Sequence, residues 1–280
     1  VLVAAGALVI EEVPRSAGSG LDLRGTLLLT GLLIAGMVAI GRIEDIGRGW
    51  LSIVWIVAAV GVTVGCGWAY LRHARRDPDA VVPLRLLRGK YLGTVNLMNV
   101  LYGAAVLGCS ALIPHYAQLR YGIDPLASGA LLTVRAVLTI CASLAAVALL
   151  RRLGHKPLLL VGMGAVIAGL VATAVAPIGM GPNLWLVLAA GVLGIGTGLA
   201  APSSNNMGMH LMPENAPAMS ALRRTFRQTG SIIAVSVTTA VTAASTQPAT
   251  ANAIAFVVLA LIMTVGTVVA GRIPNQRGRW

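Results

Sequence analysis

The chain alternates between long apolar runs and short polar connections along almost its whole length. Eight runs approach or exceed the length of about 20 residues that a helix needs to cross a bilayer. They lie near residues 25–41, 51–71, 92–114, 129–150, 157–177, 184–204, 224–244 and 252–271. The runs are continuously apolar, without the alternation that the strands of a membrane barrel need. The pattern therefore predicts an all-α integral membrane protein with eight spans.

Composition supports a lipid bilayer as the partner of this chain. Of its 280 residues, 57% are hydrophobic and only 11% are charged, whereas soluble domains carry about 25% charged residues. The net charge of +12 could suggest a nucleic-acid partner, but that would need a basic patch on a polar surface. The basic residues lie instead between apolar runs, so we expect no nucleic-acid partner.

The positions of Lys and Arg predict the orientation in the membrane. Of the 21 basic residues, 17 lie in alternate connections, three lie in the other connections, and Arg135 lies within a run. Connections rich in Lys and Arg are usually cytoplasmic. The richer set includes residues 72–91 and 272–280. We therefore expect a multi-pass protein of the inner or plasma membrane with a cytoplasmic C-terminus.

The lengths of the runs and connections divide the chain into five parts. Residues 1–10 are apolar but too few to cross a bilayer, and no basic segment precedes them as in a signal peptide. The predicted parts are the tail of a preceding span with a cytoplasmic loop (1–24), a two-helix insert (25–71), a basic cytoplasmic linker (72–91), a six-helix bundle (92–271) and a cytoplasmic tail (272–280). Six helices with both ends cytoplasmic form half of many transporters, in which two bundles rock around a central site.

Several short motifs occur one after another along the chain. They are LDLRGTLLL with GRGW after it, PHYAQLRYGIDPLASG at 114–129, LLRRLGHKPLLLVG at 149–162, GIGTGLAAPSSNN at 194–206 and FRQTGS at 226–231. Together they resemble the fourteen-helix drug:proton antiporters of the major facilitator superfamily. The resemblance implies the C-terminal portion of such a protein, from the end of helix six to helix fourteen. It implies a secondary active transporter that exports several drugs or other small molecules by alternating access, with protons as coupling ion and no cofactor.

The resemblance also implies residues that control the cytoplasmic mouth. Two belong to the basic loop, Arg152 and Lys156, and two belong to the Arg-Gln-x-Gly motif, Arg227 and Gln228. We expect Arg227 and Gln228 to bond carbonyls of a loop or helix end in one conformational state. Arg223 and Arg224 would then supply the interfacial charge. The alternative is that all three arginines only hold the helix at the interface.

Charged residues inside the runs are scarce. All nine acidic residues fall in connections, although proton-coupled carriers usually place a titratable carboxylate within the membrane. We therefore expect the coupling residues in a missing N-terminal six-helix half. Arg135 lies about two turns into its run. Its side chain could reach the headgroups, or it could serve function by pairing with a carboxylate of the missing half or an anionic substrate group.

Two further groups of residues are candidates for packing or for the substrate path. Asn96, Asn99 and Tyr102 recur three residues apart and so share a helical face. They could line the substrate path or hydrogen-bond to neighbouring helices. Gly194 and Gly198 form a small-xxx-small pair that allows close helix packing, either static or sliding.

The sequence gives little support for a metal site or for an enzyme active site. No His has a companion at the spacing of metal ligands, and the three cysteines show no CxxC spacing. A membrane-embedded enzyme or scaffold with eight spans is the alternative to a transporter. An intramembrane enzyme would be expected to show carboxylate or His clusters near one interface, and the acidic residues form no cluster within the runs. We therefore predict a transporter rather than an enzyme, without a metal site.

Overall fold

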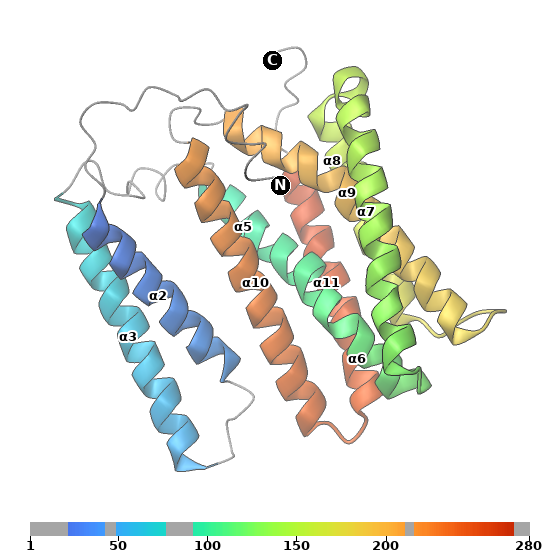
Figure 1. Cartoon of the computed structure of the whole chain (residues 1–280), viewed down its shortest axis with the longest axis horizontal. Helices are drawn as coiled ribbons and strands as arrows, with labels where there is room; N and C mark the ends of the chain where they lie inside the picture. Colours follow the sequence, from blue (N-terminus) through green and yellow to red (C-terminus); the bar gives the residue numbers. More distant parts are fainter. Residues whose placement is uncertain (1–21, 43–48, 77–91, 211–215, 272–280) are drawn as a thin grey trace, which may run out of the picture.

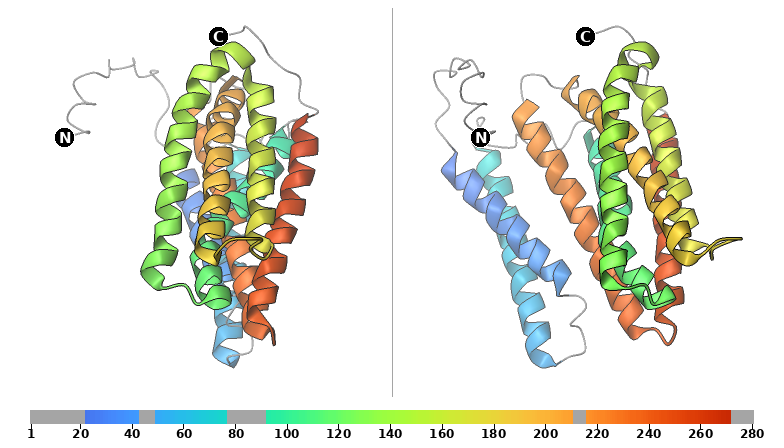
Figure 2. Two further views of the ribbon diagram at one scale, coloured as in Figure 1. Left: turned by 90° about the vertical axis from the view of Figure 1, so that its right-hand side faces the viewer. Right: turned by 45° about the vertical axis from the view of Figure 1, so that its right-hand side comes forward.

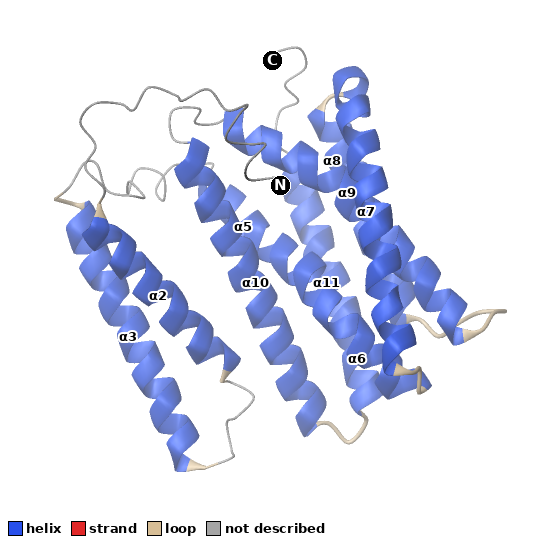
Figure 3. Cartoon of the chain, in the orientation of Figure 1, coloured by secondary structure: helices blue, strands red, loops and turns tan. Residues whose placement is uncertain are grey.

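A computed structural model of the chain describes residues 22–42, 49–76, 92–210 and 216–271. The described residues form helices, and no strand occurs among them (Figure 3). The all-α prediction is therefore confirmed. Residues 1–21, 77–91 and 272–280 lie outside the described residues, and with them most of the predicted leading tail and linker and the whole C-terminal tail.

The described helices follow the apolar runs closely. They are α2 (Leu23–Gly41), α3 (Trp50–Ala74), α5 (Leu92–Tyr102), a π-helical segment η2 (Gly103–Gly108), α6 (Cys109–Tyr121), α7 (Pro125–Leu153), α8 (His155–Ala174), α9 (Pro182–His210), α10 (Ala216–Ala244) and α11 (Pro248–Gly271). Because α5, η2 and α6 join without a break, they correspond to one predicted run. The π-helical segment adds one residue to a turn and so changes which side chains face each neighbour.

Six of the eight predicted spans meet the length and hydropathy of a membrane-crossing helix within the described residues. They are α3, the continuous helix from α5 to α6, α7, α8, α9 and α11. The remaining two runs are helical, but the apolar part of α2 is shorter and α10 contains more polar residues. The polar residues of α10 include Ser231, Ser236, Thr238 and Thr242, which are all buried. Neighbouring helices cover these side chains, so α10 needs less apolar surface than a helix surrounded by lipid.

Helix α10 lies between the α2–α3 hairpin and the other helices of the bundle (Figures 1 and 2). On one side, α2 and α3 form an antiparallel hairpin, and α2 contacts α10. On the other side, α10 packs against α5, η2 and α11. Further from the hairpin, α11 packs on α8, and α9 packs between α8 and α7. Tyr116 and Phe256 occupy the core of this bundle, fully buried with ring centroids 5.2 Å apart.

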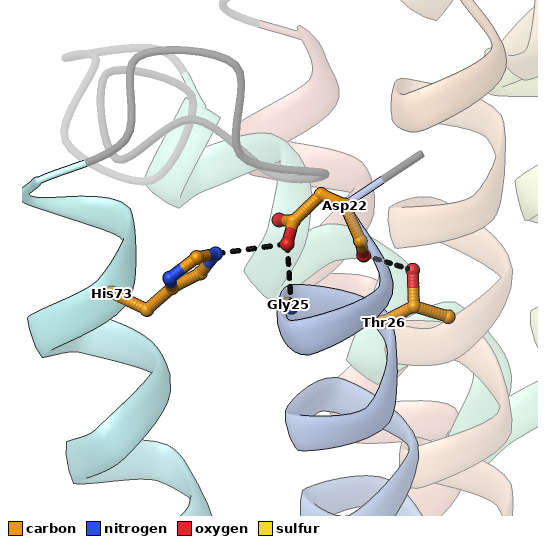
Figure 4. A network of polar contacts seen from close by, with 4 residues as sticks. All are labelled: Asp22, Gly25, Thr26 and His73. Carbon is orange, nitrogen blue, oxygen red and sulfur yellow. Dashed lines mark hydrogen bonds and ion pairs between the residues drawn. The ribbon is translucent and has the colours of Figure 1, made fainter. Parts of the chain in front are cut away.

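One polar contact connects the two helices of the hairpin (Figure 4). Asp22 lies just before α2, where its Oδ1 accepts a hydrogen bond from the Gly25 amide at 2.7 Å. The same oxygen lies 2.9 Å from His73 Nε2 in the last turn of α3. Carboxylates commonly cap a helix start because its first amides lack partners. Asp22 therefore caps α2 and at the same time binds the end of α3.

Candidate functional site

Helices α5, α9 and α10 bring a group of polar side chains together at one end of the bundle. This end is where α5 and α10 begin and where α9 finishes, at the top of Figure 1. We call the group the two-arginine cluster, and it consists of Asn99 and Tyr102 from α5, Ser204 from α9, and Arg223 and Arg227 from α10.

Arg227 is held by both neighbouring helices. Its Nε donates to Asn99 Oδ1 at 3.0 Å, and its Nη2 donates to Ser204 Oγ at 3.2 Å. The guanidinium carbon lies 4.7 Å from the centroid of the Tyr102 ring. A cation over an aromatic face gains electrostatic stabilisation, more so when it is shielded from water. These contacts fix the orientation of the guanidinium between α5 and α9.

Arg223 connects the start of α10 to the final turns of α9. Its Nη1 donates to the Asn205 carbonyl at 3.1 Å, and its Nη2 donates to the Ser204 carbonyl at 2.7 Å and to Ser204 Oγ at 2.9 Å. Helix carbonyls can accept these bonds because each oxygen has a second lone pair. Only 7% of Arg223 is exposed. Its Nε is buried and has no partner in the described part of the chain.

The structure changes the predicted roles of the arginines in α10. Arg223, which was expected to supply interfacial charge together with Arg224, is buried and bonds two carbonyls of α9. Carbonyls of a loop or helix end had been expected as partners of Arg227. Arg224 is exposed, and so is Gln228, which lies outside the two-arginine cluster. Residues four apart share a helical face, whereas Arg224 and Gln228 lie on another. This spacing relative to Arg227 could have identified Arg223 from the sequence.

Two glycines allow α10 to approach α5 and η2 closely enough to form the cluster. A Cβ atom on Gly103 would overlap the Arg227 carbonyl, and one on Gly230 would overlap the Val100 carbonyl. At each of the two glycines, the backbone of one helix therefore touches the backbone of the other. This contact sets the position of Arg227 beside Asn99, and any side chain at these two glycines would separate the helices.

Arg135 of α7 forms a separate polar site on the other side of η2. Its Nη1 donates to Ser110 Oγ, and its Nη2 donates to the Val106 carbonyl at 3.0 Å. Ser110 Oγ also donates to this carbonyl at 2.6 Å. Only 9% of Arg135 is exposed, so its side chain enters the bundle instead of extending to the headgroups. Its contacts are polar groups of the helix that contains the π-helical segment.

The remaining predicted site residues, Asn96, Arg152 and Lys156, lie outside the two-arginine cluster. Asn96 is buried one turn before Asn99, and its Oδ1 has no partner among the described residues. At the turn between α7 and α8, Arg152 is exposed and Lys156 is half-buried. Neither residue forms part of the two-arginine cluster. The predicted substrate-path residues thus separate, with Asn99 and Tyr102 beside Arg227 and with Arg135 elsewhere.

Within the described residues, no group of three or more His, Cys, Asp or Glu side chains could hold a metal ion. The carboxylates in this part of the chain are Asp22 and Asp124. Asp124 caps α7, where its Oδ2 accepts a hydrogen bond from the Leu126 amide at 2.9 Å. The polar chemistry of the bundle is therefore dominated by guanidinium, amide and hydroxyl groups.

The chain is similar to a known protein family and to a curated protein. A family model described as Major Facilitator Superfamily matches residues 1–235. The methylenomycin A resistance protein of Streptomyces coelicolor (strain ATCC BAA-471 / A3(2) / M145) is 26% identical over 269 residues, which cover 94% of this chain and 55% of that protein. The chain thus spans about half the length of this curated relative.

Proposed function

The chain belongs to the major facilitator superfamily, and from this we propose that it is the C-terminal portion of a secondary active transporter that exports drugs or similar small molecules. The family match carries this proposal. The resistance protein of Streptomyces coelicolor supports the drug-export activity. The partial coverage of that protein supports a second, N-terminal bundle as the partner of this one.

We propose the fourteen-helix branch for this transporter and protons as its coupling ion. The α2–α3 hairpin before the bundle supports the branch, because it would supply the two helices beyond the usual twelve. Both described carboxylates cap helix starts, Asp22 at α2 and Asp124 at α7. Neither is placed to carry a proton through the middle of the bundle. The proton-binding group would therefore belong to the N-terminal half.

In alternating access, the two bundles rock so that a central site opens to one side at a time. We propose that the two-arginine cluster lies at the cytoplasmic mouth, since its end of the bundle carries most of the basic connections. Reporter fusions at residues 80 and 214 should then be cytoplasmic. Fusions at residues 46, 122 and 180 should be outside. A cytoplasmic reporter at residue 180 would contradict this topology.

Transport is tested with the full-length protein in proteoliposomes that contain a trapped pH-sensitive dye. With a pH gradient imposed, added drug should cause protons to cross the vesicle membrane, because exchange couples the movement of drug to the movement of protons. This result does not depend on the charge of the drug that the protein accepts. Vesicles without protein are the control. The 280-residue chain alone should be inactive, and co-expression with the upstream half should restore exchange. Proton exchange by this chain alone would contradict the proposed division into two halves.

A further inference from the structure

We infer that the two-arginine cluster binds a carboxylate group of the transported molecule, which assigns anionic compounds as substrates. This inference rests on the proposed transport function and adds the substrate class to it. Three features carry it, namely the charge of the cluster, its unused hydrogen-bond donors and the arrangement of the groups that hold Arg227.

The cluster contains two positive charges and no carboxylate. Arg223 and Arg227 both donate to Ser204 Oγ, so their guanidinium groups lie side by side. In the described part of the chain, the carboxylates of Asp22 and Asp124 are engaged at the starts of α2 and α7. Buried charges are costly unless an opposite charge and hydrogen bonds compensate them. An anion between the guanidinium groups would remove this cost.

The donors that an anion needs are present. Arg227 uses Nε and Nη2 for Asn99 and Ser204, and its Nη1 donates to no described residue. Arg227 is only half-buried, so this Nη1 can meet a group that enters from the mouth. The Nε of Arg223 is buried and has no partner among the described residues. Guanidinium groups bind carboxylates through paired hydrogen bonds, and such charge-assisted bonds are strong.

The cluster is also organised before any ligand arrives. The Arg227 guanidinium lies over the Tyr102 ring, and its Nε and Nη2 donate to Asn99 and Ser204. Preorganised donors lose little conformational entropy on binding, which increases affinity. Arg135 also has a buried Nε without a partner among the described residues. Its Nη1 and Nη2 both donate, to Ser110 and Val106, and no second arginine shares these acceptors. The two-arginine cluster is therefore the anion site that the geometry favours.

The test measures binding to the full-length protein, purified in detergent without anionic lipid. Sodium benzoate is titrated at constant ionic strength, and thermal unfolding reports binding. Benzamide has the same ring without the charge and is the control ligand. Benzoate should raise the unfolding temperature at concentrations where benzamide does not. Arg227→Gln should weaken benzoate binding about tenfold or more, because a charged hydrogen bond is lost, while the exposed Arg224→Gln should bind as the wild type does.

A second variant tests the charge argument with both arginines in place. Asn99→Asp supplies an internal carboxylate next to Arg227, so it should abolish benzoate binding while the protein stays folded. Equal binding of benzoate by wild type and both cluster variants would overturn the inference. Stabilisation by phosphatidylglycerol, with no effect of benzoate, would also overturn it and identify a lipid phosphate as the occupant.

Binding and transport fail independently in these experiments. Benzoate titration needs no pH gradient, so an absence of drug-driven proton release would contradict the proposed function and leave the anion site standing. Proton release with cationic drugs alone, together with no benzoate binding, would overturn the anion site and leave the transport function standing.

Discussion

Two glycine-lined seams hold the bundle together, and they differ in what lies beside the glycines. In the α9 seam, a Cβ on Gly196 would lie 2.6 Å from the Val166 amide nitrogen, and one on Gly194 would lie 2.5 Å from the Arg135 carbonyl oxygen. In the α10 seam, Gly103 and Gly230 contact the opposite backbone in the same way. The α9 seam is surrounded mainly by apolar side chains, whereas the α10 seam ends at the two-arginine cluster.

This difference indicates where the bundle is rigid and where it can change. Closely packed apolar helices cannot exchange one packing partner for another, so α7, α8 and α9 should move as one unit. Hydrogen bonds between membrane helices are individually modest, about 0.6 kcal/mol on average. They can also exchange partners. We therefore expect conformational change and ligand binding to concentrate at the α10 seam.

The largest expected effect comes from adding a side chain to either seam. Gly196→Ala and Gly103→Ala should each cost about 1–3 kcal/mol or more of unfolding free energy, because backbone atoms must separate. Thermal unfolding in detergent measures the loss. Gly164→Ala is the matched control, since a Cβ there meets nothing within 4 Å. Alanine at this helical position should be neutral or stabilising by up to about 1 kcal/mol.

The glycine variants of the two seams should differ in benzoate binding, although they lose similar amounts of stability. Even if both variants unfold at the same temperature, Gly103→Ala should reduce benzoate binding, because it displaces Arg227 from Asn99. Gly196→Ala should leave that binding unchanged, since α8 and α9 meet there away from the cluster. Equal loss of binding in both variants would show that the two seams do not differ in function.

An intermediate effect is expected at Arg135, which bonds η2 from the α7 side. Arg135→Met should cost about 1–3 kcal/mol, because it removes two hydrogen bonds and leaves buried acceptors with fewer donors. Ser110→Ala should cost about 0.5–1.5 kcal/mol. Unfolding of the double variant gives the coupling between them. Strictly additive costs would contradict a shared network around the Val106 carbonyl.

The smallest effect is expected in the α2–α3 hairpin, where a Cβ added to a glycine between the helices would meet side chains instead of backbone. A Cβ on Gly31 would lie 3.1 Å from Cys66 Sγ. Asp22→Ala removes the cap of α2 and should cost about 1 kcal/mol. Asp22→Asn should keep most of the cap, since Asn is an equally good capping residue. His73→Ala isolates the contact with α3. Thermal unfolding distinguishes these variants, and an Asn variant as unstable as the Ala variant would show that the charge matters more than the cap.

The sequence by itself determined the helices, their approximate ends and the membrane environment. Hydrocarbon thickness sets the length of an apolar run, and a helix satisfies its own backbone groups in lipid. The runs near 129–150 and 157–177 therefore correspond closely to α7 and α8. The spacing of Gly194 and Gly198 likewise placed both on one helical face, because helical periodicity is local. Local chemistry was enough for these features.

Only the tertiary structure decided which polar groups meet. The burial of Arg223 depends on Ser204 and Asn205, which lie in another helix and approach it only when α9 and α10 pack together. The π-helical turn at Gly103–Gly108 and the inward direction of Arg135 depend likewise on contacts between separate helices. A composition of apolar and small residues permits either an α or a π turn. The donors and backbones that favour one arrangement come from elsewhere in the chain, so no local pattern could specify it.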